Sequence, residues 1–169
     1  MNINYFNILD MEENFSIDKE KLEDNYLSSQ KKFHPDNAKD NKQKLDFLKI
    51  SSDINAAYKN LKNDYLRAVY ILGKYGINLT DESYNKTNSL STVFLQEIFE
   101  RRQQIEEIEG FDNLNNLLEN EKIVRKDIIN KIDELFKISD YKKAAIEVQK
   151  LKYQDNIINR IEEKIEKCF

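Results

Sequence analysis

The chain has little of the material from which catalytic and metal sites are usually built. Its 169 residues include one cysteine, one histidine, one proline and three glycines. Cys168 has no second cysteine to pair with, so the chain has no disulfide framework or thiolate metal cluster, which fits a reducing compartment. A zinc site needs more histidine and cysteine ligands than these, and no Gly-rich phosphate-binding loop is present. The composition therefore argues against a metal-dependent enzyme and predicts no catalytic residue, cofactor or metal.

Charge and apolar runs exclude two further classes of partner. The net charge is −4, and residues 1–76 hold 12 basic and 12 acidic side chains, which leaves 15 and 19 for the remainder. Neither part has the basic excess that nucleic-acid binding requires. No apolar run is long enough to span a bilayer, and the acidic start is unlike a signal or transit peptide. We expect a cytoplasmic protein without nucleic-acid or membrane partners.

What the chain does contain predicts an all-α fold. Charged residues make up 34% and apolar residues 40%, with few helix breakers between them. Four helical segments are predicted in the first 76 residues. The first covers about residues 5–9, and the second begins at a cap on Ser16 or Asp18 and ends near Phe33. The third begins at a capping box formed by Asp40 and Gln43 and includes Leu61. The fourth begins at Asn63 or Asp64 and is stopped by Gly73 and Gly76.

The second half predicts a three-helix bundle after a polar linker. The linker covers residues 77–90, and the bundle covers 91–169. Its helices are expected from Ser91 to Glu109 before Gly110, from Asn113 to Lys137, and onward from Ser139. Short connections between long helices favour antiparallel neighbours.

The only histidine and the only proline are adjacent, at His34 and Pro35. In one interpretation this stretch is a helix stop and turn, because proline cannot continue a helix. Lys31 and Lys32 would then complement the helix dipole. In the other it is a docking tip, where the Asp36 carboxylate accepts a partner's arginine and the lysines attract an acidic surface. The stretch alone leaves both open.

The wider pattern resembles a J domain, the module with which DnaJ-type co-chaperones stimulate ATP hydrolysis by DnaK-type chaperones. His-Pro-Asp follows the basic pair, INAAY follows at residues 54–58, and YFNIL and FSIDKEKLEDNYLSSQKKFHPD fit in order and spacing over residues 1 to about 75. LRAVYILGKYGINL, at residues 66–79, narrows the resemblance to HscB co-chaperones of iron–sulfur cluster assembly. FLQEIFERRQQIEEIE and AAIEVQKLKYQDNI, from residues 94 and 144, are similar to the C-terminal domain of HscB.

The resemblance implies an L-shaped protein with a J domain at 1–76 joined to the bundle. It implies an activator, not an enzyme, that stimulates an HscA/DnaK-type chaperone and delivers an IscU-type scaffold protein to it for iron–sulfur cluster assembly and transfer. Chaperone binding would use Lys31, Lys32, His34, Pro35 and Asp36. Scaffold binding would use Leu95, Gln96, Phe99, Glu100, Gln103 and Tyr153.

Some positions depart from the family or allow another interpretation. Asn37 follows the signature where the family usually has lysine, and Gln96 and Gln103 stand where an apolar and an acidic residue are expected. Leu95 and Phe99 could belong to the core, although Phe94, Ile98, Ile105 and Ile108 can form a separate inward face. The alternative functions are a general J-domain co-chaperone for unfolded clients and a helical scaffold protein without a chaperone link.

Overall fold

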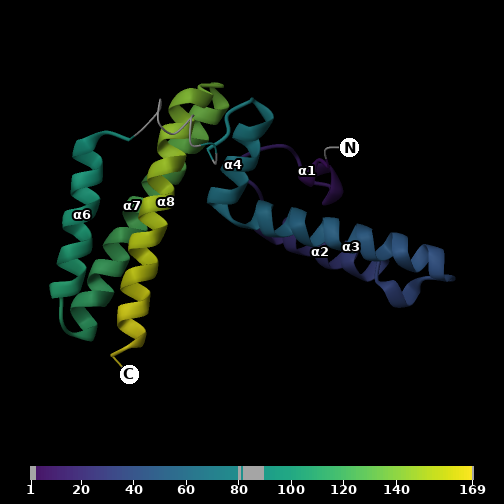
Figure 1. Ribbon diagram of the computed structural model, residues 1–169, viewed down its shortest axis with the longest axis horizontal. Coiled ribbons are helices and arrows are strands. Elements are labelled where there is room, and N and C mark those ends of the chain that lie inside the picture. The colour runs from purple at the N-terminus through teal and green to yellow at the C-terminus, as the bar shows by residue number, and fades with distance from the viewer. Residues whose placement is uncertain (1–2, 80, 82–89, 169) are drawn as a thin grey trace. The chain divides into compact units, whose positions relative to one another are not determined.

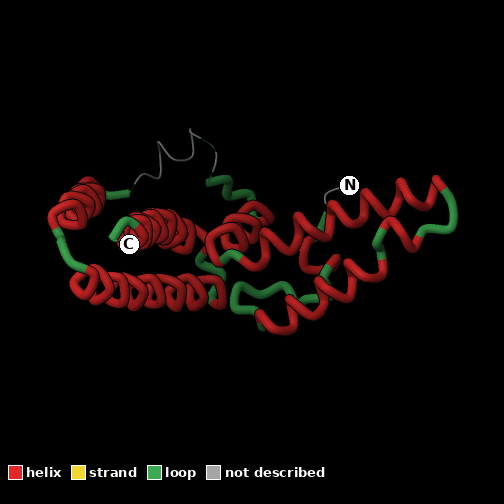
Figure 2. The backbone as a smooth tube through the Cα atoms, turned by 90° about the horizontal axis from the view of Figure 1, so that it is seen from below, coloured by secondary structure: helices red, strands yellow, loops and turns green. Residues whose placement is uncertain are grey.

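The computed structural model describes residues 3–79, 81 and 90–168, and within them every regular element is a helix (Figures 1 and 2). This confirms the predicted all-α class. The chain divides into two compact units, Met1–Ile71 and Leu72–Phe169, which are described separately. Residues 80 and 82–89 of the predicted linker lie outside the described residues. The L shape and the domain limits stay predictions.

The first unit is built around a helical hairpin. Its helices are α1 (Tyr5–Ile8), α2 (Lys19–Lys32), the short 3-10 helix η1 (Pro35–Asn37), α3 (Asn41–Lys62) and α4 (Asp64–Lys74), which runs past the division between the units. Helices α2 and α3 lie side by side (Figure 1). The largest fully buried side chains of this unit are Phe6, Leu9, Leu22, Ile54 and Leu61.

Side-chain caps fix where the hairpin helices begin. The Asp18 carboxylate accepts hydrogen bonds from the backbone N–H groups of Glu20 and Lys21, so Asp18 caps α2. Asp40 caps α3 by accepting a 2.7 Å bond from the backbone N–H of Gln43. The predicted capping box is wrong in one detail, because the Gln43 side chain accepts from the N–H of Lys39, not from that of Asp40. The caps therefore determine the first residue of each of the two helices.

Gly76 and not Gly73 ends α4. The helix continues through Gly73 to Lys74, and Gly76 then adopts a left-handed conformation with φ of 76°. The backbone N–H of Ile77 bonds to the carbonyl oxygen of Leu72 at 3.0 Å, which closes the helix end. Glycine enters this conformation without the steric cost that a Cβ atom brings.

A buried arginine joins three segments of the first unit. The Arg67 guanidinium donates to the carbonyl oxygens of Phe15 and Leu61, both at 2.6 Å, and to the Asp64 carboxylate at 2.7 Å. It also lies over the Phe15 ring, 4.9 Å from its centroid. Because the donors of one side chain satisfy groups on a loop, on α3 and on α4, Arg67 fixes the start of α4.

The second unit contains α6 (Thr92–Glu107), α7 (Phe111–Lys137) and α8 (Tyr141–Glu166), which confirms the predicted three-helix bundle. Ser91, the predicted start of the first bundle helix, caps α6, and Gly110 precedes α7 with φ of 90°. Ser139, between α7 and α8, has a left-handed φ of 59°. The core shared by the helices consists of Ile98, Ile105, Leu114, Leu118, Ile157, Ile158 and Ile161.

None of the helices within the described residues is long and apolar enough to cross a membrane.

Candidate partner-binding sites

The His-Pro-Asp signature occupies the loop between α2 and α3. Helix α2 ends at Lys32, and the backbone N–H of Phe33 closes it by bonding to the carbonyl oxygen of Ser29 at 3.0 Å. Pro35 then starts η1 with His34 as its N-cap, and α2 ends before Pro35, near Phe33, as predicted. Lys31, Lys32, His34 and Asp36 are all exposed. The structure therefore brings the five predicted chaperone-binding residues together at one end of the hairpin.

Hydrogen bonds within the loop hold its geometry. The His34 Nδ1 atom accepts a 3.3 Å bond from the backbone N–H of Asp36, and lies 3.5 Å from a carboxylate oxygen of the same residue. The Asn37 side-chain amide donates a 2.7 Å bond to the carbonyl oxygen of Lys31. From the sequence, Asn37 was notable only because it replaces the lysine that is usual in the family. In the structure its side chain connects η1 to the last turn of α2.

The loop is also anchored to α3. The Phe33 and Phe47 rings meet edge to face with centroids 5.6 Å apart, a favourable arrangement for aromatic pairs. The Asp36 side chain is 82% exposed, so its carboxylate can accept hydrogen bonds from a partner. An exposed acceptor on an anchored loop suits bidentate recognition of an arginine.

A second exposed surface lies on α6. Ile98 and Ile105 are buried, and Phe94 and Ile108 pack against the same core, so these four residues form the inward face that the spacing predicted. Leu95 is 37% exposed and Phe99 is 60% exposed. The alternative that Leu95 and Phe99 are core residues is therefore wrong. Both present apolar surface to solvent.

The remaining predicted scaffold-binding residues fall into two groups. Gln96, Glu100 and Gln103 are exposed on α6, and the Gln96 amide donates a 3.0 Å bond to the Glu100 carboxylate. Tyr153, on α8, is half-buried and packs against the core, with its ring 6.1 Å from that of Phe94. This contact places Tyr153 of α8 against the inward side of α6.

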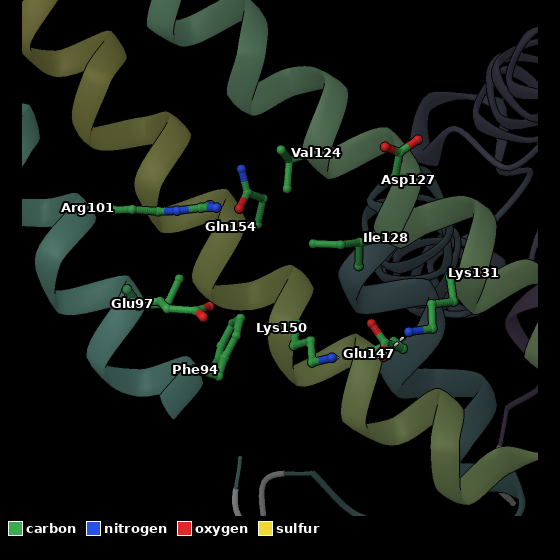
Figure 3. A pocket seen from close by; sticks show the side chains of 11 residues that line it. Phe94, Glu97, Arg101, Val124, Asp127, Ile128, Lys131, Glu147, Lys150 and Gln154 are labelled. Carbon is green, nitrogen blue, oxygen red and sulfur yellow. Dashed lines mark hydrogen bonds and ion pairs between the residues drawn. The ribbon is translucent and has the colours of Figure 1, made fainter. Parts of the chain in front are cut away.

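A cavity of about 300 Å³ opens between α6, α7 and α8 (Figure 3). Its apolar wall includes Val124 and Ile128, and its polar wall includes charged pairs that the sequence did not predict. The buried Glu147 carboxylate lies 2.8 Å from Lys131 and 3.0 Å from Lys150. Figure 3 labels all three side chains on the cavity wall.

Two networks of charged and polar side chains connect the helices of the bundle at this cavity. Burial alone raises the pKa of the Glu147 carboxyl, but hydrogen bonds from Lys131 and Lys150 outweigh burial and lower that pKa. Nearby, the buried Gln154 amide donates to the carboxylate and to the carbonyl oxygen of Glu121, whose carboxylate also pairs with Arg101 at 3.3 Å. A helical hydrophobic pattern gives no signal for such buried polar groups, because their partners lie on other helices.

Comparison with known proteins gives relatives for both halves of the chain. The family described as the HSCB C-terminal oligomerisation domain matches residues 90–162. Co-chaperone protein HscB of Proteus mirabilis is 31% identical, covering 99% of this chain and 98% of its own. Co-chaperone protein HscB of Buchnera aphidicola is 34% identical, covering 92% of this chain and 91% of its own.

Solved structures share the fold. Human co-chaperone protein HscB is 27% identical with a TM-score of 0.85, covering 96% of this chain and 82% of the human chain. Chaperone HscB from Vibrio cholerae has a TM-score of 0.87 at 24% identity, covering 99% of this chain and 100% of its own. Since the sequence matches extend from the His-Pro-Asp loop to the C-terminal bundle, the chain belongs to the HscB family of co-chaperone proteins.

Proposed function

We propose that this co-chaperone stimulates ATP hydrolysis by an HscA/DnaK-type chaperone and delivers an IscU-type scaffold protein to it. Iron–sulfur cluster assembly and transfer would follow, in the cytoplasm. The observation that carries the proposal is the exposed Asp36 carboxylate on an anchored loop beside Lys31 and Lys32. Family membership of the whole chain favours this function over a general co-chaperone for unfolded clients.

Docking would begin with charge and end with the Asp36 carboxylate. Lys31 and Lys32 attract an acidic surface and speed the encounter. Asp36 then accepts hydrogen bonds from an arginine of the chaperone, while His34 and Asn37 hold the loop in place. Because the loop is already ordered by these bonds, little conformational entropy is lost on binding.

Stimulation follows if the chaperone conformation that hydrolyses ATP binds this tip more tightly than its other conformations. A ligand shifts an equilibrium only by its differential affinity for the two states. The residues that perform hydrolysis would belong to the chaperone, so this chain acts as an activator, not as an enzyme.

The scaffold protein would bind the exposed face of α6. Leu95 and Phe99 supply apolar surface, and Glu100, bonded to Gln96, supplies a carboxylate beside them. Gln103 extends the polar rim on the same helix. Tyr153 would support this face from beneath through Phe94. Exposed apolar side chains with a polar rim are typical of protein interaction sites.

An Asp36→Asn variant tests the chaperone-binding proposal. The substitution keeps the shape of the side chain but removes the charge that strengthens its hydrogen bonds, so we expect stimulation of steady-state ATPase activity to fall by about tenfold or more. Asp112→Asn, an exposed carboxylate at the start of α7, is the matched control and should stimulate like the wild type. Equal stimulation by Asp36→Asn and the wild type would refute the proposal.

A further inference from the structure

The first half of α3 presents two leucines to solvent beside the signature loop. Leu45 is 68% exposed and Leu48 is 49% exposed. They are three residues apart, so both lie on the same side of the helix. Single exposed leucines are ordinary on protein surfaces, whereas adjacent ones in a charged rim are typical of interaction sites. We call Lys42, Lys44, Leu45, Leu48 and Lys49 the α3 stripe.

Leu45 and Lys49 of the α3 stripe point away from the face of α3 that packs against α2. The side of α3 that faces α2 carries Phe47, whose ring contacts Phe33, and farther along the buried Ile54 and Ala57. In helical projection Leu45 and Lys49 lie nearly opposite Phe47. Leu45 is therefore not needed to hold α2 against α3, and Leu48, about 100° from Phe47 in the same projection, keeps about half of its surface in solvent.

Positive charge is concentrated around the α3 stripe. Residues 1–76 hold equal numbers of basic and acidic side chains, 12 of each, but residues 31–49 hold six lysines and three aspartates. Among the described residues, the three lysines of the stripe have no ion pair. A surface that combines apolar groups with unneutralised cations suits a partner with apolar groups rimmed by carboxylates.

The α3 stripe is continuous with the signature loop. The backbone N–H of Lys39 bonds to the Gln43 side chain, and the backbone N–H of Gln43 bonds to the Asp40 carboxylate, each at 2.7 Å. These bonds join the end of the loop to the first turn of α3. A partner that contacts His34 and Asp36 is thereby brought close to the stripe.

We propose that the α3 stripe is a further docking surface for the same ATPase chaperone, where it contacts apolar side chains surrounded by acidic ones. This inference rests on the proposed function. The stripe and residues 31–40 are each net positive, and hydrogen bonds join the loop to the first turn of α3, which favours one partner for both. Two copies of the chain that met stripe to stripe would bring like charges together, which opposes association. A membrane surface would gain little from two leucines, because interfacial helices bury a longer apolar face.

The test is a titration of the chaperone's ATPase activity with the full-length chain, without scaffold protein. In a Leu45→Gln, Leu48→Gln variant, glutamine keeps the helix propensity but removes the apolar surface. We expect the half-saturating concentration to rise about tenfold, as the lost burial of two leucines implies. Maximal stimulation should be retained, because His34, Pro35 and Asp36 are unchanged. Circular dichroism and thermal unfolding check that α3 is intact.

Matched controls separate the stripe from general surface effects. Ile123→Gln, Ile138→Gln removes exposed apolar surface from the second unit and should leave the half-saturating concentration unchanged. A triple change of Lys42, Lys44 and Lys49 to glutamine should weaken the salt dependence of binding. The same change at Lys126, Lys142 and Lys152, which alters net charge equally, should not. Loss of salt dependence in both triple variants would overturn the proposal.

The outcomes distinguish this inference from the function on which it rests. Suppose that the wild type stimulates the ATPase activity and Asp36→Asn does not. If the leucine variant then has the same half-saturating concentration as the wild type, only the stripe proposal is overturned. If the wild type itself fails to stimulate, both proposals are overturned. Two further measurements test other occupants: binding of the wild type to phosphatidylserine vesicles and its self-association in sedimentation. If the leucine variant loses one of these and keeps the wild-type half-saturating concentration for the chaperone, the stripe proposal is overturned and the stripe is assigned to that occupant.

Discussion

At the residue scale, Arg67 and Arg160 show how burial changes the contribution of an ion pair to the free energy of unfolding. Each lies 2.7 Å from a carboxylate oxygen, Arg67 from Asp64 and Arg160 from Glu106. Arg67 and Asp64 are buried, whereas Arg160 and Glu106 are about half exposed. Exposed pairs contribute about 0.2 to 1 kcal/mol, but breaking a buried pair leaves a charge without a partner and costs about 3 to 5 kcal/mol.

We therefore predict that Arg67→Met lowers the free energy of unfolding by about 3 kcal/mol. The variant would remove the Arg67 donors from the carbonyl oxygens of Phe15 and Leu61 and from the Asp64 carboxylate, which keeps Lys19 at 3.3 Å. Arg160→Met is the matched control and should cost less than about 1 kcal/mol. Urea unfolding followed by circular dichroism measures both values. Equal losses in the two variants would contradict the role assigned to Arg67.

Residues whose function is local were predictable from the sequence, and those whose partners are distant were not. Asp18 and Asp40 were recognised as helix caps because a cap and the groups it satisfies lie within three residues. Arg67 was noticed only as part of a family motif, since Phe15 lies 52 residues away. Asn37 was interpreted as a missing charge, because nothing in its spacing indicates a bond to the Lys31 carbonyl oxygen.

Helices α7 and α8 are held together, at the element scale, by a charge network as well as by their apolar faces. Lys131 of α7 reaches Glu147 of α8, which also accepts a bond from Lys150 one turn farther along the same helix. The hydrophobic spacing predicted both helices and nearly all of their bounds. It placed no charged residue in the interface, because the pattern treats every glutamate as a solvent-facing position.

Glu147 gives the bundle a pH dependence whose sign follows from its environment. Its pKa is lowered in the folded state by Lys131 and Lys150. Its contribution to stability is therefore complete above the unfolded pKa of about 4.3 and is lost as pH falls through the lower folded value. We predict that Glu147→Gln is less stable than the wild type at neutral pH and that this difference narrows below about pH 4.

Thermal unfolding of both proteins across this pH range measures the difference. Glu119→Gln removes an exposed carboxylate that pairs with Lys122 at 3.0 Å and should change stability little at any pH. A constant difference between Glu147→Gln and the wild type would contradict the linkage.

The two candidate surfaces, at the scale of the whole molecule, belong to different units of one chain. The signature loop lies in the first unit, and the exposed face of α6 lies in the second. A protein built in this way can lose one activity and keep the other. The family assignment was predictable from motifs in both units, whereas the contact between Tyr153 and Phe94 was not, because it depends on how α6 packs against α8.

We predict that a Leu95→Ala, Phe99→Ala variant stimulates the chaperone like the wild type when the scaffold protein is absent. The additional stimulation caused by scaffold protein should fall, because truncating two interface anchors costs about 2 kcal/mol or more of binding energy. ATPase assays with and without scaffold, together with titration calorimetry of the scaffold, measure the two effects. Val93→Ala, an exposed apolar residue in the first turn of α6, is the control. Unchanged scaffold affinity in the double variant would place the patch elsewhere.

The position of the one histidine has a practical consequence. Because His34 is the only imidazole among 169 residues and lies in the exposed signature loop, its ring protons give a single set of resonances in a nuclear magnetic resonance spectrum. Their chemical shifts report the occupancy of the loop when the chaperone is deuterated, so that its own ring protons give no signal. A titration with the chaperone would therefore follow binding through the ring resonances of His34 itself.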